Sequence, residues 1–315
     1  GSCGGAKHAR TRHGESAVVG CPRHSPILAR RVDRVSGRHP TAEASSGWAG
    51  CGIFYGGLMS SVVRLHMMST GSMESSLGGF LEGEEGTLRY PVPVFVIDHP
   101  RGLVAVDAGL HPDLSTSSDR LGPLDGPFQV QLPPDGSGTV GPQLASSGFD
   151  PTEIHHVIVT HLHFDHVGGL VELPNARLVV QSAEWAARDD ELPVSIGAYN
   201  PDDIAHGHDR LEVDGDHDLF GDGTITCLLT DGHTAGHQSV RVRTAQGPFV
   251  ICGDCCYLRR TLTNEHLPPF GVDRDRQLAA VRRMARERIN GAALIFGHDP
   301  EQWETIARAG LSTAI

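Results

Sequence analysis

Short apolar runs, separated by polar and glycine-rich segments, dominate the sequence from about residue 60 onward. The runs are rich in valine, isoleucine and leucine, a composition typical of buried strands. We expect strands over residues 92–97, 103–107, 156–160, 177–181, 225–230, 238–243, 248–254 and 293–298. The first two are separated by His-Pro-Arg-Gly, which predicts a hairpin.

Helical patterns lie between these strands. One short helix (141–148) is expected to end at Gly148, and another (182–190) to begin at the capping residue Ser182. The strongest helical repeat covers residues 273–289, and a last helix covers 299–310. The expected buried face of the 273–289 helix consists of Leu278, Val281, Ala285 and Ile289. The polar segment 111–140 is expected to be an exposed loop. Strands and helices thus mix along the chain, which indicates an α+β protein.

The first 58 residues differ from the rest in charge and pattern. They carry eight Lys/Arg and three Asp/Glu, a balance of +5, whereas the rest of the chain carries 18 and 35, a balance of −17. Because the segment shows no sustained periodicity, we expect residues 1–58 to be a basic, disordered N-terminal extension. Alternatively, translation begins at Met59 and these residues are an upstream extension. Residues 59–315 are assigned to one domain.

Composition narrows the partners and the compartment. A net charge of −12 over 315 residues argues against nucleic acid or an anionic membrane as the main partner. Seven scattered cysteines do not suggest a disulfide framework, so we expect a reducing, cytoplasmic location. Apolar residues within 48–68 point to a contact between two copies of the chain, and hence to a homodimer.

Ionisable side chains follow four of the expected strands. The run "HVIVT" leads directly into "HLHFDHVGG", where three histidines and an aspartate stand within six positions. Three later strands are followed by His233, Asp254 and His298. Function in mixed folds gathers in the loops at one end of a sheet, so we expect these side chains to meet. The candidate metal ligands are His161, His163, Asp165, His166, His233, Asp254 and His298.

Imidazole and carboxylate groups suit zinc and similar divalent metals. Seven ligands are too many for one tetrahedral site, but they suit two metals that share a carboxylate. His161 and His163 alternate along an extended turn and can reach one ion, while Asp165 and His166 can reach a second. Gly168-Gly169 would let the following helix pack closely behind this loop. By contrast, "HGHD" (206–209) follows no apolar strand and is expected to be an ordinary loop.

The motif "THLHFDHVGG" resembles the HxHxDH signature of the metallo-β-lactamase superfamily. "DGHTAGH", "CGDCCY" and "FGHD" follow it in the order that this family shows. The resemblance covers roughly residues 60–315. It implies an αβ/βα sandwich of four layers, in which two mixed sheets face each other, helices cover the outside, and metals lie at one edge.

Within that superfamily the chain is most similar to the N-acyl-homoserine lactonases, which act in quorum quenching. "HLHFDH", with Phe164 between the ligands, looks like theirs, and Tyr257 in "GDCCY" stands where they carry a tyrosine that contacts the lactone. "LHMMSTGSMESS" (65–76) resembles their N-terminal strand and substrate-contact loop. The resemblance therefore implies substrate contacts from Phe164, Tyr257 and Met68.

The resemblance also implies a mechanism. Two Zn²⁺ ions, or other divalent metals, would lower the pKa of a bridging water, and the resulting hydroxide would attack the lactone carbonyl. One metal and the Tyr257 hydroxyl would stabilise the developing oxyanion. Asp254 is expected to bridge the metals, and Asp165 to carry the proton to the leaving ring oxygen, as a ligand or beside the metal. The expected activity is that of a carboxylic ester hydrolase.

Two alternatives stay open from the sequence. One is another hydrolase of small lactones, esters or thioesters on the same metals, similar to glyoxalase II. No basic C-terminal cluster suited to an anionic glutathione moiety is apparent, and the acidic catalytic region disfavours a polyphosphate substrate. The other is a non-catalytic or redox scaffold, which a metal analysis of the purified protein would distinguish.

Overall fold

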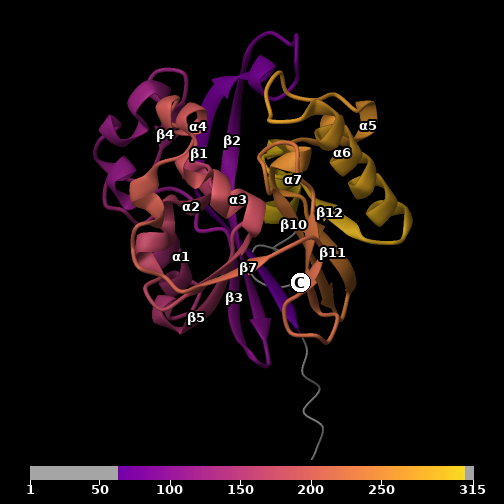
Figure 1. The fold of residues 1–315 in the computed structure, drawn as a ribbon. Helices are drawn as coiled ribbons and strands as arrows, with labels where there is room; N and C mark the ends of the chain where they lie inside the picture. The colour runs from indigo at the N-terminus through magenta and orange to yellow at the C-terminus, as the bar shows by residue number, and fades with distance from the viewer. Residues whose placement is uncertain (1–62, 309–315) are drawn as a thin grey trace, which may run out of the picture. The chain divides into compact units, whose positions relative to one another are not determined.

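Two mixed β-sheets form the framework of the protein (Figure 1). The structure is a computed structural model, and it describes residues 63–308. The basic extension expected over residues 1–58 lies outside the described residues, as does most of the segment 48–68 expected to form a dimer contact. None of the described helices combines the length and apolar character needed to cross a bilayer.

The first sheet has seven strands in the order β4-β1-β2-β3-β5-β6-β7. Its strands are β1 (Arg64–Ser76), β2 (Thr87–His99), β3 (Gly102–Val106), β4 (Gln129–Gln131), β5 (Ile154–Ile158), β6 (Arg177–Gln181) and β7 (Arg210–Val213). β2 and β3 form the expected antiparallel hairpin, and β3, β5, β6 and β7 run parallel to one another. The carboxyl ends of these four strands therefore lie at one edge of the sheet.

The second sheet has five strands in the order β12-β11-β10-β9-β8. Its strands are β8 (His217–Asp218), β9 (Ile225–Leu229), β10 (Gln238–Thr244), β11 (Gly247–Ile251) and β12 (Ala293–Ile295). β10 is antiparallel to both β9 and β11, and β12 is parallel to β11. As a consequence β9, β11 and β12 share one direction, and the loops that carry His233, Asp254 and His298 leave the same edge.

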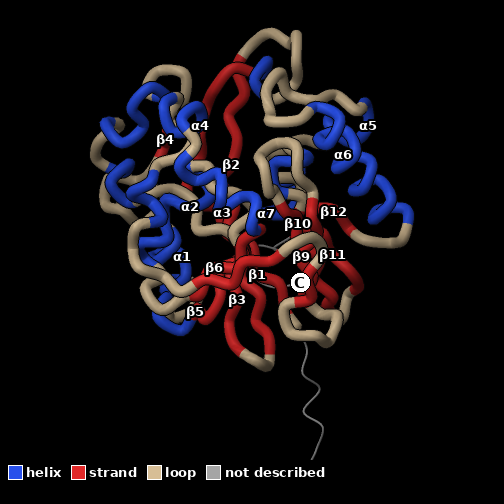
Figure 2. The backbone as a smooth tube through the Cα atoms, viewed as in Figure 1, coloured by secondary structure: helices blue, strands red, loops and turns tan. Residues whose placement is uncertain are grey.

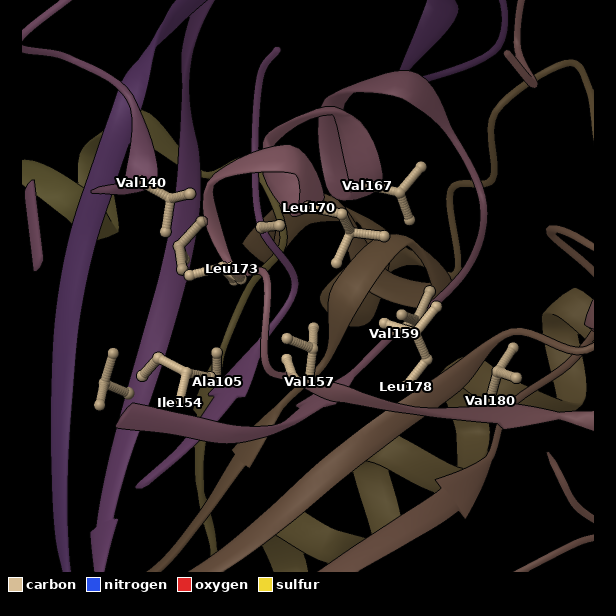
Figure 3. Close-up of a cluster of buried hydrophobic side chains, with 14 of the residues drawn as sticks. Ala105, Val140, Ile154, Val157, Val159, Val167, Leu170, Leu173, Leu178 and Val180 are labelled. Carbon is tan, nitrogen blue, oxygen red and sulfur yellow. The ribbon is translucent and has the colours of Figure 1, made fainter. Parts of the chain in front are cut away.

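Most of the helices flank the sheets on their outer sides, as the tube in Figure 2 shows, whereas α7 (Pro300–Arg308) contacts β2 and packs against apolar residues between the sheets. The helices are α1 (Val140–Ser146), α2 (Phe164–Val167), α3 (Ser182–Ala186), α4 (Glu191–Ser195), α5 (Arg259–Asn264), α6 (Arg274–Ile289) and α7 (Pro300–Arg308). In the first half, residues of α1 and of the segment 167–173 pack on β5 and β6, as in the apolar cluster of Figure 3. In the second half, α6 packs on β9, β11 and β12.

A third apolar cluster lies between the two sheets. Residues of β1, β2, β3 and β5 contact residues of β9, β10, β11 and β12, and the members include Ile97, Val106, Ile158, Val240 and Ile251. Burying apolar side chains on both faces of each sheet is the main stabilising contribution here. The order helix, sheet, sheet, helix confirms the predicted αβ/βα sandwich.

Two sequence-based expectations were wrong in detail. The segment 111–140 is more than an exposed loop, because β4 pairs with β1 at the edge of the first sheet. On α6, Val281 is buried as expected and Leu278 and Ala285 pack partly buried against the core, but Ile289 is exposed. The fully buried residues of α6 also include Gln277, Ala280 and Met284, which were not predicted. The amide of Gln277 donates to the carbonyl of Phe270 (2.9 Å), which allows a polar residue to occupy the buried face.

Candidate metal centre

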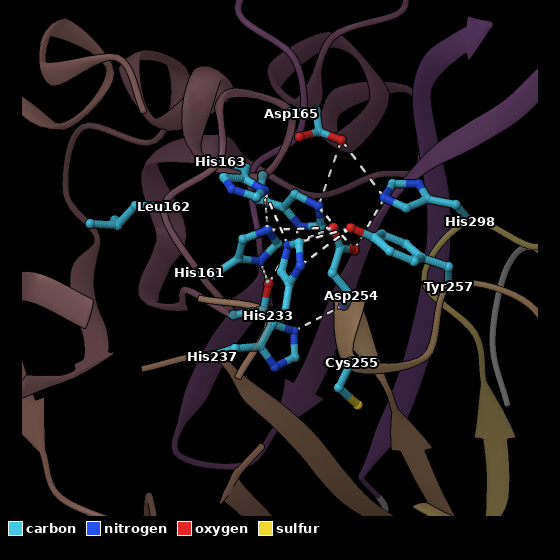
Figure 4. A network of polar contacts seen from close by, with 12 residues as sticks. His161, Leu162, His163, Asp165, His233, His237, Asp254, Cys255, Tyr257 and His298 are labelled. Carbon is cyan, nitrogen blue, oxygen red and sulfur yellow. Dashed lines mark hydrogen bonds and ion pairs between the residues drawn. The ribbon is translucent and has the colours of Figure 1, made fainter. Parts of the chain in front are cut away.

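All seven predicted ligands meet at the edge where the parallel strands of both sheets end (Figure 4). They form two groups, and within each group one ligand atom per residue lies within 4.8 Å of the others. The first group is His161, His163, His233 and Asp254, and the second is Asp165, His166 and His298. Ligands from the first half of the chain thus face ligands from the second half.

The Asp254 carboxylate stands between the two groups. Its Oδ2 lies 3.5 Å from Nε2 of His161 and 3.4 Å from Nε2 of His233. Its Oδ1 lies 3.4 Å from Nε2 of His166 and 3.2 Å from Nε2 of His298. One carboxylate therefore presents a different oxygen to each group, which is the geometry of a bridging ligand.

The local fold of the first motif explains its spacing. His161 and His163 lie in the extended segment after β5, and α2 begins at Phe164, which turns Asp165 and His166 inward. The helix then packs against the turn after β3. A Cβ added to Gly169 would lie 2.2 Å from the carbonyl oxygen of Ala108, so only glycine fits this approach.

Hydrogen bonds on the far side orient the histidine rings of the second group. Nδ1 of His166 lies 2.7 Å from the Asp107 carboxylate, and Nδ1 of His298 lies 2.9 Å from the carbonyl of Pro91. These contacts leave the Nε2 atoms facing the centre, an arrangement typical of metal-bound histidine. His166 Nε2 and Asp254 Oδ1 are buried without a hydrogen-bond partner. Since buried polar atoms are rarely unsatisfied, the residues present fit a divalent metal.

The electrostatics of the two groups differ. Burial lowers the pKa of His161 and His163, so both imidazoles are neutral and able to ligate. Burial tends to lower the pKa of His166 and His298, but the carboxylates of Asp254 and Asp165 outweigh burial and raise both pKa values. Burial likewise opposes ionisation of Asp254, yet the surrounding imidazoles hold its pKa well below the usual range. The second group therefore favours positive charge, which a metal ion would supply.

Tyr257 lies beside this centre, three residues after Asp254. Its hydroxyl is 3.4 Å from Nδ1 of His233, and its ring packs edge-on against Phe80. Burial, followed by the Asp254 and Asp165 carboxylates, raises the pKa of Tyr257 well above its usual value. The phenol keeps its proton, so it can donate a hydrogen bond at this position.

The two other predicted substrate contacts lie at different depths. Phe164 is partly buried, and its ring lies 6.2 Å from that of Phe128 in a T-shaped pair. Met68, on β1, is buried in the apolar cluster that also holds Leu162 and Tyr199. Its contact with substrate stays a prediction.

Three buried polar residues of this region were missed from the sequence. Asp107 follows β3 and binds His166 and Thr160, and the position of an aspartate after a buried strand was a usable signal. His237 lies behind His233, and its Nε2 accepts from the Asp254 N–H at 2.9 Å. Burial and the neighbouring His233 lower the pKa of His237 to about 3. The third is Glu184, which gave no signal.

The "HGHD" motif (206–209) lies in a loop, as expected. His206 and His208 lie in a loop between the 3-10 helix at Pro201–Ile204 and β7, and neither belongs to the two ligand groups. The four described cysteines are all buried and unpaired, which agrees with the absence of a disulfide framework over residues 63–308.

Comparison with known proteins agrees with this geometry. Residues 88–298 match the metallo-β-lactamase superfamily. The chain is 31% identical over 260 residues to the N-acyl homoserine lactonase AttM of Azorhizobium caulinodans. The match covers 78% of this chain and 97% of that protein. The AttM lactonase of Rhizobium johnstonii shows the same identity and coverage.

A solved structure of an N-acyl homoserine lactone hydrolase, with the product N-hexanoyl-L-homoserine at its catalytic metal centre, has a similar fold. The TM-score is 0.70 at 23% identity, and the match covers 78% of this chain and 96% of that one. The family match spans most of the chain, and the two sheets and the clustered ligands agree with it. The protein belongs to the metallo-β-lactamase superfamily.

Proposed function

We propose that this protein is a two-metal hydrolase that opens the lactone ring of N-acyl-homoserine lactones. The observation that carries the proposal is the Asp254 carboxylate, with one oxygen toward His161 and His233 and the other toward His166 and His298. A carboxylate shared in this way would suit two neighbouring divalent ions, as in two-metal hydrolases. The substrate is inferred from the relatives named as N-acyl homoserine lactonases, which the chain resembles over most of their length.

We take both metals to be zinc, because histidine and carboxylate ligands suit that ion. His161, His163 and His233 would hold one ion, Asp165, His166 and His298 the other, and Asp254 would bridge them. When bound, the ions would supply Lewis acidity and would activate a water molecule as the nucleophile.

Tyr257 would stabilise the charge that develops on the lactone carbonyl oxygen. Its hydroxyl is buried, protonated and adjacent to His233. A fixed donor in a water-poor site stabilises an oxyanion more than water does, because it needs no reorganisation during the reaction.

Asp165 would move the proton to the ring oxygen that leaves. Its Oδ2 lies 3.7 Å from Nε2 of both His166 and His298, so the carboxylate belongs to the second ligand group and does not lie between the two groups as Asp254 does. A carboxylate in this position is able to act as a general base and then as a general acid. Phe164 and Met68 would contact the acyl part of the substrate.

The decisive experiment is a pH-drop assay with homoserine lactones of varied acyl length. Parallel reactions would use nitrocefin and a glutathione thioester, the substrates that represent the other hydrolases of this fold. Ring opening of the lactones, with weak or no turnover of the other two, is the expected result. Turnover of nitrocefin or of the thioester alone would replace the lactonase proposal with the alternative hydrolase.

Two further expectations belong to the same proposal. We infer a cytoplasmic location from the scattered, unpaired cysteines, and a homodimer from the apolar residues of segment 48–68. Analytical ultracentrifugation of the full chain tests the dimer, and fractionation of cells tests the location.

A further inference from the structure

A fully buried carboxylate, Glu184 on α3, accepts hydrogen bonds from three separate segments of the chain. Its Oε1 accepts from the backbone N–H of Leu162 at 2.9 Å and from the hydroxyl of Tyr199 at 2.6 Å. Its Oε2 accepts from the backbone N–H of Gly236 at 2.8 Å. The mechanism proposed above gives this residue no role.

Two of these donors lie inside the loops that carry the candidate ligands. Leu162 separates His161 from His163, and Gly236 lies three residues after His233. The first loop follows β5 of the seven-stranded sheet, and the second follows β9 of the five-stranded sheet. Glu184 therefore joins, through one side chain, the two loops that must converge for the first ligand group to close.

The second loop lies directly against the start of α3. A Cβ added to Gly236 would lie 2.4 Å from the backbone nitrogen of Glu184 and 2.7 Å from its Cβ. Glycine is required at this position because the loop backbone approaches the helix this closely. The distance between the loop of His233 and α3 is thereby fixed by backbone contact as well as by the hydrogen bond.

The third donor extends the link to the next segment. Tyr199 pairs through its backbone with His163 in an isolated bridge, and the two rings lie 5.6 Å apart. Burial and the nearby Glu184 raise the pKa of Tyr199, so its hydroxyl remains a donor to the carboxylate. His163 is thus held both through Leu162 and through Tyr199.

The Glu184 carboxylate is held by hydrogen bonds rather than by ion pairs. Its three contacts are all hydrogen-bond donors, and within residues 63–308 no Lys, Arg or His forms an ion pair with it within 4.0 Å. A carboxylate is the side chain that satisfies three converging donors, since glutamine would turn an N–H group toward one of them.

We propose that Glu184 is a positioning residue that sets the separation between the His161/His163 loop and the His233 loop, and so the closure of the first metal site. The inference rests on the proposed two-metal function. It assigns no contact with substrate to Glu184, because the residue acts through the ligands that its hydrogen bonds hold.

The test compares Glu184→Gln with the matched control Glu172→Gln. Glu172 is likewise a carboxylate with a donor on each oxygen, accepting from the hydroxyl of Thr139 at 2.9 Å and from the N–H of Gly141 at 2.8 Å, but neither donor lies in a ligand loop. Zinc release to a chelator, the absorption spectrum of the cobalt-substituted protein, and kcat and KM for a homoserine lactone would be measured for both variants and the unmodified chain.

We expect Glu184→Gln to weaken zinc retention and to lower kcat by roughly 10- to 100-fold, the usual effect of losing a partner behind metal ligands. The cobalt spectrum should change as well, while Glu172→Gln should keep the zinc release rate, spectrum and kcat of the unmodified chain. Equal zinc release and an unchanged spectrum in Glu184→Gln would overturn the inference, even if its melting temperature fell.

A second variant covers the case in which Glu184→Gln does not fold. Tyr199→Phe keeps the carboxylate and removes one donor, and it should accelerate zinc release by a smaller factor; release at the unmodified rate would count against the inference. If the unmodified chain binds zinc but opens no lactone, the proposed substrate fails, whereas the comparison of zinc release still decides the role of Glu184.

Discussion

The Asp107 carboxylate lies 2.7 Å from Nδ1 of His166 and also accepts from the backbone N–H and the hydroxyl of Thr160. Asp107 has a positive φ of 59°, a conformation that Asp and Asn tolerate better than most residues. The end of β3 therefore orients a ligand that follows β5, the neighbouring parallel strand.

Replacing Asp107 by Asn tests this relationship, because Asn keeps the shape and the backbone conformation. The amide is a weaker acceptor for the His166 N–H, so zinc affinity and kcat should each fall by about 10- to 100-fold. Metal content after dialysis and steady-state kinetics would measure the change. Unaltered metal content and kcat would show that His166 needs no such partner.

Asp165→Asn should separate metal binding from catalysis. The amide oxygen can still face His166 and His298, so most of the metal should remain, but the side chain can no longer carry a proton. Turnover is expected to fall by about 10²- to 10⁴-fold, the range for loss of a general acid–base group. Metal analysis and kcat on the same preparation provide the check, and unchanged turnover would remove Asp165 from the mechanism.

Tyr257→Phe should lower kcat with little change in KM or in folding stability. The ring keeps its contact with Phe80, whereas the hydroxyl near His233 is lost. Loss of one oxyanion donor slows related reactions by about 10²-fold or more. A rise in KM at constant kcat would instead mean that the hydroxyl binds the ground state and the transition state equally.

Arg120→Met should destabilise the protein in a pH-dependent way. Arg120 binds the buried Asp203, whose pKa is raised by burial to about 6 from 3.8, even though the guanidinium opposes the shift. Because the folded-state pKa is raised, the stability linked to protonated Asp203 is complete below pH 3.8 and is lost as pH rises through about 6. Removing the guanidinium raises this pKa further, so at high pH the buried Asp203 must either keep its proton or carry a charge without a partner.

The melting temperature of Arg120→Met should therefore fall further below that of the unmodified chain at pH 8 than at pH 5. At pH 8 the loss should approach ~3–5 kcal/mol, as for other buried charges that lose their partner. The double variant Arg120→Met/Asp203→Asn serves as control and should lose the pH-dependent part of the deficit. Equal deficits at pH 5 and pH 8 would contradict the assignment of the charge to Asp203.

Added zinc should raise the free energy of unfolding, by an amount set by the free zinc concentration relative to Kd. His166 Nε2 and Asp254 Oδ1 are buried and have no hydrogen-bond partner, so a metal would satisfy both. Zinc at a free concentration 1,000-fold above Kd adds about 4 kcal/mol to the free energy of unfolding. Thermal melts with a chelator and with added zinc measure this difference, which should shrink strongly in Asp254→Asn; no shift on adding zinc would argue against a metal centre.

Most of the strands and part of the metal centre could be predicted from the sequence because each depends on a short, continuous stretch of residues. The β-branched runs predicted the strands that carry the ligand loops, and the histidine cluster after residues 156–160 predicted one edge of the centre. The short elements β4, β7 and α4 were not predicted. A strand of three or four residues, such as β4, has too little periodicity of its own and is formed by pairing with a neighbour.

The residue chemistry of the two ligand groups was thus determined by the sequence, but their separation was decided by tertiary structure. His233 was predicted as a ligand from its place after a strand, but His237 lies in the same short loop, and only the packing of the chain turns His237 toward the Asp254 N–H instead. Glu184 gave no signal for the same reason. Its role depends on donors from residues 162, 199 and 236, which are distant in sequence and meet only because two sheets bury a common core.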